Sequence, residues 1–115
     1  TDNIERGDKL HRFAEEFIEN SRRPETEEEE KIVEFIEGLD GEIESEVEFT
    51  YPENGKVYTG RADIVSVTEE KVKLIDIKTS DNFAEAYKNQ MELYEKAFQA
   101  LYPKREVETE IFELL

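Results

Sequence analysis

Asp76 and Lys78 place an acid and a base two residues apart near the end of a short apolar run. Because a β-strand sends residues i and i+2 to the same face, both side chains should point the same way. Val72 and Leu74 continue that face, so the two charges are expected to be buried, which costs free energy unless they are used or paired. With a second carboxylate, Asp63, on the preceding predicted strand, the set favours a divalent metal site. The acids would hold the ion, and the ammonium would steady a water molecule or the charge on a phosphate.

Two pairs of residues at helical spacing could join this chemistry. His11 lies one turn before Glu15, and Gln90 lies one turn before Tyr94, so each pair shares a helix face. Oxygen ligands completed by water molecules suit Mg²⁺ or Mn²⁺. A lone histidine on a helix is more often a surface or boundary residue than a ligand, and a tyrosine at such a position often packs against the core. An acid and a base on one strand can also form a structural ion pair, so the residues alone leave these alternatives open.

The helices that must position these side chains follow from apolar spacing and from breakers. The pattern predicts one helix over about 5–20 and a second that starts at Pro24 and ends at Gly38 and Gly41. A long helix is predicted over about 82–102, with Ser80 or Asp81 as its cap. Pro103 stops it, and its apolar side is expected to carry Phe83, Tyr87, Met91, Tyr94, Phe98 and Leu101.

The strands begin where the apolar period changes to two, near Glu42. A turn at 52–55 predicts a hairpin of strands 43–51 and 56–67, and a second turn at 68–71 leads into a strand over 72–78. A last strand is expected over 105–115. Because a tight turn joins the second and third strands, Asp63 and Asp76 can be lateral neighbours. In the first strand one face is expected to be apolar and the other acidic: Ile43, Val47, Phe49 and Tyr51 against Glu44, Glu46 and Glu48.

The composition bounds the class of protein. At 115 residues the chain fits one domain, 1–115, and its apolar share of 37% is enough for a core. No apolar run has the length of a membrane span, so we expect a cytoplasmic protein without a membrane partner. The absence of cysteine excludes disulfides, thiolate zinc sites and an iron–sulfur cluster.

The net charge is the observation that fits a nucleic-acid substrate least well. The formal charge is −16, whereas nucleic-acid binders usually carry excess base. Bound divalent cations, a protein partner or a missing segment could supply positive charge. Local relief could also come from exposed bases of this chain, with Arg12, Arg22, Arg23, Lys104 and Arg105 as the candidates.

Taken together, the motifs resemble the PD-(D/E)xK nuclease superfamily. They are most similar to its RecB-like branch, and within it to the phage and viral exonuclease-like members. The resemblance spans most of the chain, and the elements occur in the family's order. They are Gly7 and His11 on the first helix, then Glu15, Ser45-Glu46, Gly60 to Asp63, Asp76 to Thr79, and Gln90 to Tyr94.

The resemblance implies an α/β fold with a central mixed sheet flanked by helices. This is a restriction-endonuclease-like core in the order α-α-β-β-β-α-β. It implies an Mg²⁺- or Mn²⁺-dependent deoxyribonuclease that hydrolyses phosphodiester bonds in DNA. His11, Asp63, Asp76 and the carbonyl oxygen of Ile77 would bind the metal, and Lys78 would stabilise the charge on phosphate.

The remaining motif residues have supporting roles in the resemblance. Gln90 and Tyr94 would shape the substrate side or pack the strand that bears Lys78. Glu15 and Glu46 would bind a second metal or hold the ligands of the first metal in place. Members of the family with an iron–sulfur cluster need four cysteines, so that subgroup is excluded for this chain.

Two other interpretations stay open. The chain could be a catalytically inactive, acidic binding or scaffold module that retains the nuclease fold, in which case its surface would mimic nucleic acid or bind a basic protein. It could also hold a structural metal without turnover. Retention of both the Asp76/Lys78 pair and the distant His11 argues against an inactive module, because such a module has no chemical need for them.

Overall fold

The structure is a computed structural model that describes residues 2–80 and 84–115. The order of elements is α1 (Asp2–Asn20), α2 (Glu27–Glu37), β1 (Glu42–Glu53), β2 (Lys56–Val67), β3 (Lys71–Lys78), α3 (Ala84–Leu101) and β4 (Glu106–Glu113). The predicted α/β class and order of elements are confirmed. The predicted cap Asp81 and the contact at Phe83 lie outside the described residues, as does the side chain of Tyr87.

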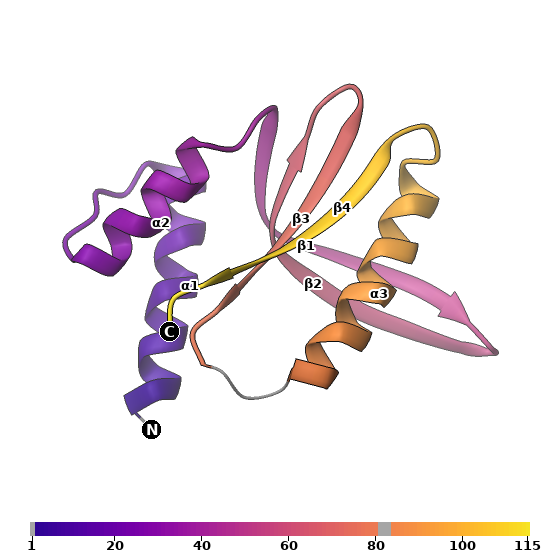
Figure 1. Ribbon diagram of the computed structural model, residues 1–115, viewed down its shortest axis with the longest axis horizontal. Helices are drawn as coiled ribbons and strands as arrows, with labels where there is room; N and C mark the ends of the chain where they lie inside the picture. The colour runs from indigo at the N-terminus through magenta and orange to yellow at the C-terminus, as the bar shows by residue number, and fades with distance from the viewer. Residues whose placement is uncertain (1, 81–83) are drawn as a thin grey trace.

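The strands form one mixed sheet in the order β1-β2-β3-β4. The pairs β1–β2 and β2–β3 are antiparallel. The pair β3–β4 is parallel, because α3 carries the chain back across the sheet. Helices α1 and α2 lie on one side of the sheet and α3 lies on the other, and the β1–β2 hairpin projects beyond them (Figure 1). No helix within the described ranges is long and apolar enough to cross a membrane.

Strand β3 is apolar on both faces because helices cover both sides of it. Val72 and Leu74 belong to the core under α3, while Ile75 and Ile77 belong to the core under α1 and α2. This alternation places Asp76 and Lys78 on the α3 side, as the sequence predicts, and both are buried, with 7% and 8% of their surface exposed. Leu101, predicted on the apolar side of α3, is instead 61% exposed at the end of the helix.

The prediction of a single apolar face for β1 is wrong. Ile43 packs with the core of α1 and α2, whereas Val47, Phe49 and Tyr51 pack with the core of α3. The change of face falls at Glu46, which has a left-handed backbone with φ of 49°. A non-glycine residue seldom adopts this conformation, and one such residue is enough to reverse the alternation of side chains along a strand.

The ends of α2 and of the hairpin are set by short polar motifs. Helix α2 begins three residues after Pro24, because Thr26 caps it: the Thr26 hydroxyl accepts a hydrogen bond from Glu29 N at 3.1 Å. The hairpin turn is narrower than predicted and consists of Asn54 and Gly55, with φ of 52° and 77°. Two consecutive residues with positive φ match the type I′ turn, whose twist suits a two-residue hairpin.

Candidate active site

The candidate site lies where the pairing between β2 and β3 ends. The β2–β3 ladder runs from Val67 and Val72 to Ile64 and Ile75, and the next pair in register, Asp63 and Asp76, is not joined by the ladder. Ile77 N donates instead to the Asp63 carboxylate at 2.7 Å, so this side chain replaces the missing backbone partner. The structure therefore brings Asp63 and Asp76 together as lateral neighbours on two strands that separate at this point.

A third acid stands at the same level of the sheet. Ser45 pairs with Ile64 and Val47 pairs with Ala62, so Glu46 lies opposite Asp63 on β1, where the β1–β2 ladder skips one pair. Glu46 is the residue with left-handed backbone described above. Strain of this kind is found where the surrounding structure fixes a side chain in a particular position. Glu46, Asp63 and Asp76 thus form a row of carboxyl groups across three adjacent strands.

The two aspartates of this row share a proton. Burial raises the pKa of Asp76, the hydrogen bond and the negative charge of Asp63 add to this effect, and the pKa reaches about 8. For Asp63 burial also acts to raise the pKa, but hydrogen bonds from His11 and Asp76 outweigh it, and the pKa lies below its usual value. At neutral pH Asp76 is therefore protonated and Asp63 is ionised, as expected for neighbouring carboxyls that cannot both carry charge.

His11 reaches the carboxylates from α1, on the opposite side of the sheet from α3. Its Nε2 atom lies 2.9 Å from Ile77 O and 3.3 Å from Asp63 Oδ2, and its Nδ1 atom lies 2.7 Å from Gly7 O. The hydrogen bond to Asp63 is the main cause that raises the pKa of His11 to about 9, against the effect of burial. Since both ring nitrogens face acceptors, the doubly protonated imidazolium satisfies all of these contacts.

Gly7 explains why α1 can come so close to the sheet. A Cβ atom at Gly7 would lie 2.8 Å from Thr79 Oγ1, so a larger residue would require either the Thr79 side chain or the helix to shift. Because residues i and i+4 share a helix face, this close approach also places His11 beside Ile77. The Gly7–His11 spacing thus has a packing cause as well as a chemical one.

Arg6, which was not among the residues expected at the site, holds the same helix in place. Its guanidinium donates to Thr79 O at 3.0 Å and to Leu114 O at 2.6 Å, and it forms an ion pair with Glu28. These contacts tie α1 to α2 and to the ends of β3 and β4. Nothing in the sequence distinguishes Arg6 from the other arginines except its place next to Gly7.

Tyr94 and Gln90 lie behind the site and hold β2. The Tyr94 hydroxyl donates to Arg61 O at 2.9 Å and accepts a hydrogen bond from Gln90. The Tyr94 ring meets Phe49 edge-on at 4.8 Å, and a Cβ at Gly60 would lie 2.7 Å from the Phe49 ring. Burial is the main cause that raises the pKa of Tyr94, so it stays a neutral hydrogen-bonding group. Its contacts make Tyr94 a positioning residue that fixes the backbone just before Asp63.

Glu15 and Glu46 extend the site toward the outer side of β1. Burial raises the pKa of Glu46, the charges of Asp63 and Glu15 act in the same direction, and the charge of Arg61 opposes them. Arg61 Nε lies 2.9 Å from Glu46 Oε2, so Arg61 is a base that pairs with an acid of the site. The bases expected from the sequence to offset the net charge are different ones. Two of them are engaged elsewhere, because Arg22 pairs with Glu16 and Arg105 stacks on Tyr102.

The donor set fits the divalent metal that the family resemblance implies. It offers the oxygens of Asp63 and Asp76, a nitrogen of His11 and the carbonyl oxygen of Ile77, which suit Mg²⁺ or Mn²⁺. In the part of the chain that is described, no three His, Asp or Glu side chains are already arranged as a metal cage. The physical reason is that these groups bind each other through protons. A metal at these atoms has to displace the protons of His11 and Asp76.

Comparison with known protein families, with curated proteins and with solved structures found no match to this chain. The functional proposal below therefore rests on the residue pattern and on the geometry of the site.

Proposed function

We propose that the chain is an Mg²⁺- or Mn²⁺-dependent deoxyribonuclease with a restriction-endonuclease-like core. Within the PD-(D/E)xK superfamily we assign it to the RecB-like branch, as a cytoplasmic enzyme with exonuclease-like action, related to phage or viral nucleases or to those of recombination and repair. One observation carries the proposal. Asp63 lies opposite Asp76 at the point where β2 and β3 separate, and His11 enters from α1 at 3.3 Å from Asp63. A structural sheet has no need for two carboxylates and an imidazole at the end of a ladder.

The proposed roles follow the positions of the side chains. His11, Asp63, Asp76 and the carbonyl oxygen of Ile77 would hold the metal ion, which when bound activates water and neutralises charge on phosphate. Lys78, on the same strand face as Asp76, would stabilise the negative charge that grows on the phosphate in the transition state. Gly7 and Arg6 set the position of His11, and Tyr94 with Gln90 sets the position of Asp63. Glu15 and Glu46 are the candidates for a second metal.

The decisive experiment is a cleavage assay with the purified chain. Labelled linear and circular DNA are incubated with Mg²⁺, with Mn²⁺ or with EDTA, and we expect degradation of the linear DNA only when a divalent ion is present. The matched control is Asp76→Asn, which keeps the size of the side chain and the proton-donating form that Asp76 has at neutral pH. Cleavage that survives EDTA, or that is unchanged in Asp76→Asn, would contradict the proposal.

A second candidate is an acidic binding module without turnover. The specific observation in its favour is that His11, Asp63 and the Ile77 backbone are hydrogen-bonded to one another. The formal charge of −16 also favours a basic protein partner over DNA. This candidate predicts that the folded protein neither binds nor cleaves DNA with any divalent ion, and that Mn²⁺ does not raise its melting temperature.

A further inference from the structure

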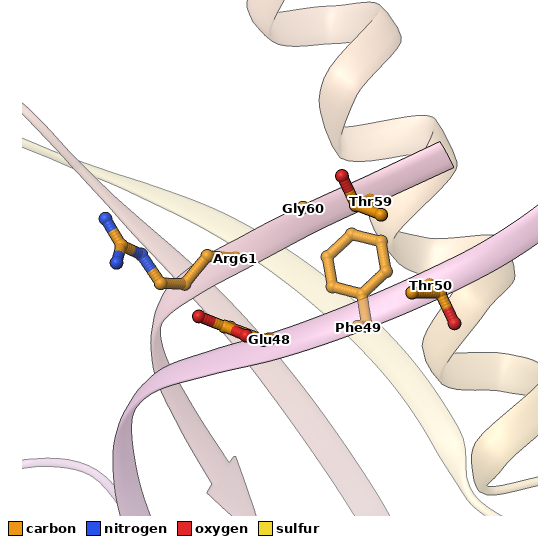
Figure 2. A pocket seen from close by; sticks show the side chains of 6 residues that line it. All are labelled: Glu48, Phe49, Thr50, Thr59, Gly60 and Arg61. Carbon is orange, nitrogen blue, oxygen red and sulfur yellow. The ribbon is translucent and has the colours of Figure 1, made fainter. Parts of the chain in front are cut away.

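An open hollow of about 560 Å³ lies on the projecting half of the β1–β2 hairpin, beside the candidate active site. Such a volume is within the range of small-ligand sites, roughly 300–1,000 Å³. Figure 2 shows that the Arg61 and Glu48 side chains extend in one direction and that the Phe49 ring lies between the two strands. The hollow is lined by Glu48, Phe49, Thr50, Thr59, Gly60 and Arg61.

The wall of this hollow is polar and exposed, and its floor is rigid. Glu48 pairs in register with Arg61, and Thr50 pairs with Thr59, so these four exposed side chains share one face of the hairpin. Phe49 and Gly60 alternate with these residues, so the Phe49 ring points to the opposite face, where it packs edge-on against Tyr94 and Phe98 of α3 and holds the two strands behind the hollow in place. Hydroxyl groups and a guanidinium on a rigid two-stranded floor are suited to bind a phosphate-bearing chain rather than an apolar ligand.

The strand that leads from the hairpin turn to the site is locally basic. Residues 54–62 contain Lys56 and Arg61 and no acid, although the chain has 31 acidic residues in 115. This acid-free stretch ends at Asp63 itself. Along β2 itself the first carboxylate is the proposed metal ligand Asp63, where a divalent cation would offset the charge, whereas the neighbouring strand β1 presents Glu53 and Glu48.

The Arg61–Glu46 ion pair lies beside the hollow, and its arginine is open to solvent. The two atoms lie 2.9 Å apart, yet Glu46 Oε2 is buried and, among the described residues, receives no well-aligned hydrogen bond. The Arg61 side chain is 59% exposed, so its guanidinium can be reached from solvent. A phosphate offers a guanidinium the two parallel hydrogen bonds that this carboxylate does not accept.

We propose that this hollow is a subsite for a single strand of DNA, in which Arg61 exchanges Glu46 for the phosphate next to the one that is cleaved. The subsite rests on the proposed function, since it places the strand beside the metal ligands. A single strand is favoured over a duplex because a duplex needs many phosphate contacts and this chain offers few exposed bases near the site. Glu48, across the strands from Arg61, is the acid that opposes such binding.

Two pairs of matched variants test the subsite. Fluorescence anisotropy with a labelled single-stranded oligonucleotide in Ca²⁺ reports binding apart from cleavage. Arg61→Ala should weaken binding roughly tenfold or more and lower the slope of log affinity against log salt by about 0.7. Arg23→Ala, which removes the same charge from an exposed position between α1 and α2, should change affinity less than about twofold. Arg61→Lys should recover part of the affinity because it keeps the positive charge. The recovery should be incomplete because an ammonium cannot make the two parallel hydrogen bonds of a guanidinium.

The second pair removes a negative charge at two places on β1. Glu48→Gln should tighten binding about two- to fivefold, the scale of one surface charge interaction, whereas Glu44→Gln, exposed on the other part of the strand, should not. Equal effects of Arg61→Ala and Arg23→Ala, or of Glu48→Gln and Glu44→Gln, would mean diffuse attraction and would overturn the subsite. Binding of a duplex more tightly than the single strand, or no binding of either, would overturn it as well.

The failure of the subsite and the failure of the nuclease proposal give different results. If the wild-type protein cleaves DNA and Arg61→Ala leaves KM unchanged, the subsite is wrong and the nuclease stands. If the wild-type protein never cleaves but binds the oligonucleotide through Arg61, the nuclease proposal is wrong and only the single-strand binding by the hollow stands.

Discussion

The two halves of β2 differ in how many neighbours their backbone has. Residues 64–67 pair with β1 on one side and with β3 on the other, and they lie in the interior of the sheet. Residues 56–62 pair with β1 alone and are mostly exposed. Asp63 is the residue between them, and its carboxylate accepts the hydrogen bond of Ile77 N where the ladder stops. The comparison teaches that the candidate site forms where backbone groups lose a partner and polar side chains replace it.

The largest effect should separate chemistry from stability. Asp76→Ala should abolish Mn²⁺ binding and DNA cleavage and cost only about 1 kcal/mol of stability, because it removes the neutral carboxyl that hydrogen-bonds Asp63. Ile64→Ala, in the inner half of β2, should instead cost about 2–5 kcal/mol of unfolding free energy, since Ile64 is fully buried. Calorimetric titration with Mn²⁺ and thermal melting test the two variants. Unchanged Mn²⁺ affinity in Asp76→Ala would show that the ligand assignment is wrong.

The next effect separates metal binding from turnover. Lys78→Ala should leave Mn²⁺ affinity close to that of the wild type, since an ammonium is no metal ligand. It should lower kcat by about two to three powers of ten, the scale of losing one group that stabilises the transition state. Single-turnover cleavage with labelled linear DNA measures it. A normal rate in Lys78→Ala would mean that the lysine serves only the structure of β3.

Metal affinity should depend steeply on pH. The pKa of His11 is raised to about 9 and that of Asp76 to about 8, so both groups hold a proton at pH 7 in the metal-free protein. Binding of Mn²⁺ should release these protons, and affinity should rise by roughly ten- to a hundredfold per pH unit between pH 6 and 8. Calorimetry in two buffers with different ionisation enthalpies counts the protons. Asp76→Asn is the control and should release one proton fewer from whatever binding remains.

The same pKa shifts predict how the metal-free fold responds to pH. The pKa of His11 lies above its usual 6.5, so its stabilisation is full below pH 6.5 and is lost as pH rises through 9. The pKa of Asp76 is raised from 3.8 to about 8, so the folded protein holds this proton more tightly than the unfolded chain does. The stability that this proton contributes is therefore lost as pH rises from about 4 to 8. The melting temperature in EDTA should therefore fall between pH 6.5 and 9. A melting temperature that rises across this window would contradict the proposed protonation of the site.

A smaller effect tests the close approach of α1. Gly7→Ala should destabilise the fold by about 1–3 kcal/mol and weaken Mn²⁺ binding, because the new Cβ would lie 2.8 Å from Thr79 Oγ1. Gly38→Ala is the matched control, since its nearest contact, Phe35 O, would be 3.4 Å away. Thr79→Ala should rescue Gly7→Ala by removing the clashing atom. If Thr79→Ala does not restore the stability of Gly7→Ala in this double-mutant cycle, the contact with Thr79 is not the cause of the destabilisation.

The smallest effect concerns the hydrogen bond behind the site. Tyr94→Phe keeps the ring contact with Phe49 and removes the donor to Arg61 O, which should cost about 1 kcal/mol of stability. Because Arg61 O lies in the backbone just before Asp63, kcat should fall severalfold while KM changes little. A change in KM alone would mean that Tyr94 contacts the DNA rather than positioning β2.

The sequence predicted those parts of the fold that depend on local spacing. The order of elements, the two faces of β3 and the neighbouring positions of Asp63 and Asp76 follow from apolar period and turn length. The change of face at Glu46 could not be predicted, because a left-handed glutamate depends on tertiary packing rather than on propensity. Arg6 and Arg61 were missed for a related reason: their partners Leu114 and Glu46 are distant in sequence or on another strand. The chemical roles assigned to the site stay predictions.

The contact between Arg6 and Leu114 O has a consequence for the order in which the protein is completed. The two residues are 108 positions apart, so the guanidinium finds this acceptor only after β4 has joined the sheet. During synthesis α1 emerges before β4, so α1 must wait for β4 before Arg6 can bind Leu114 O. Until then, one of the contacts that hold α1 against the sheet, and with it the position of His11, is not made. A ribosome-bound chain that ends before β4 would carry every proposed ligand without this contact.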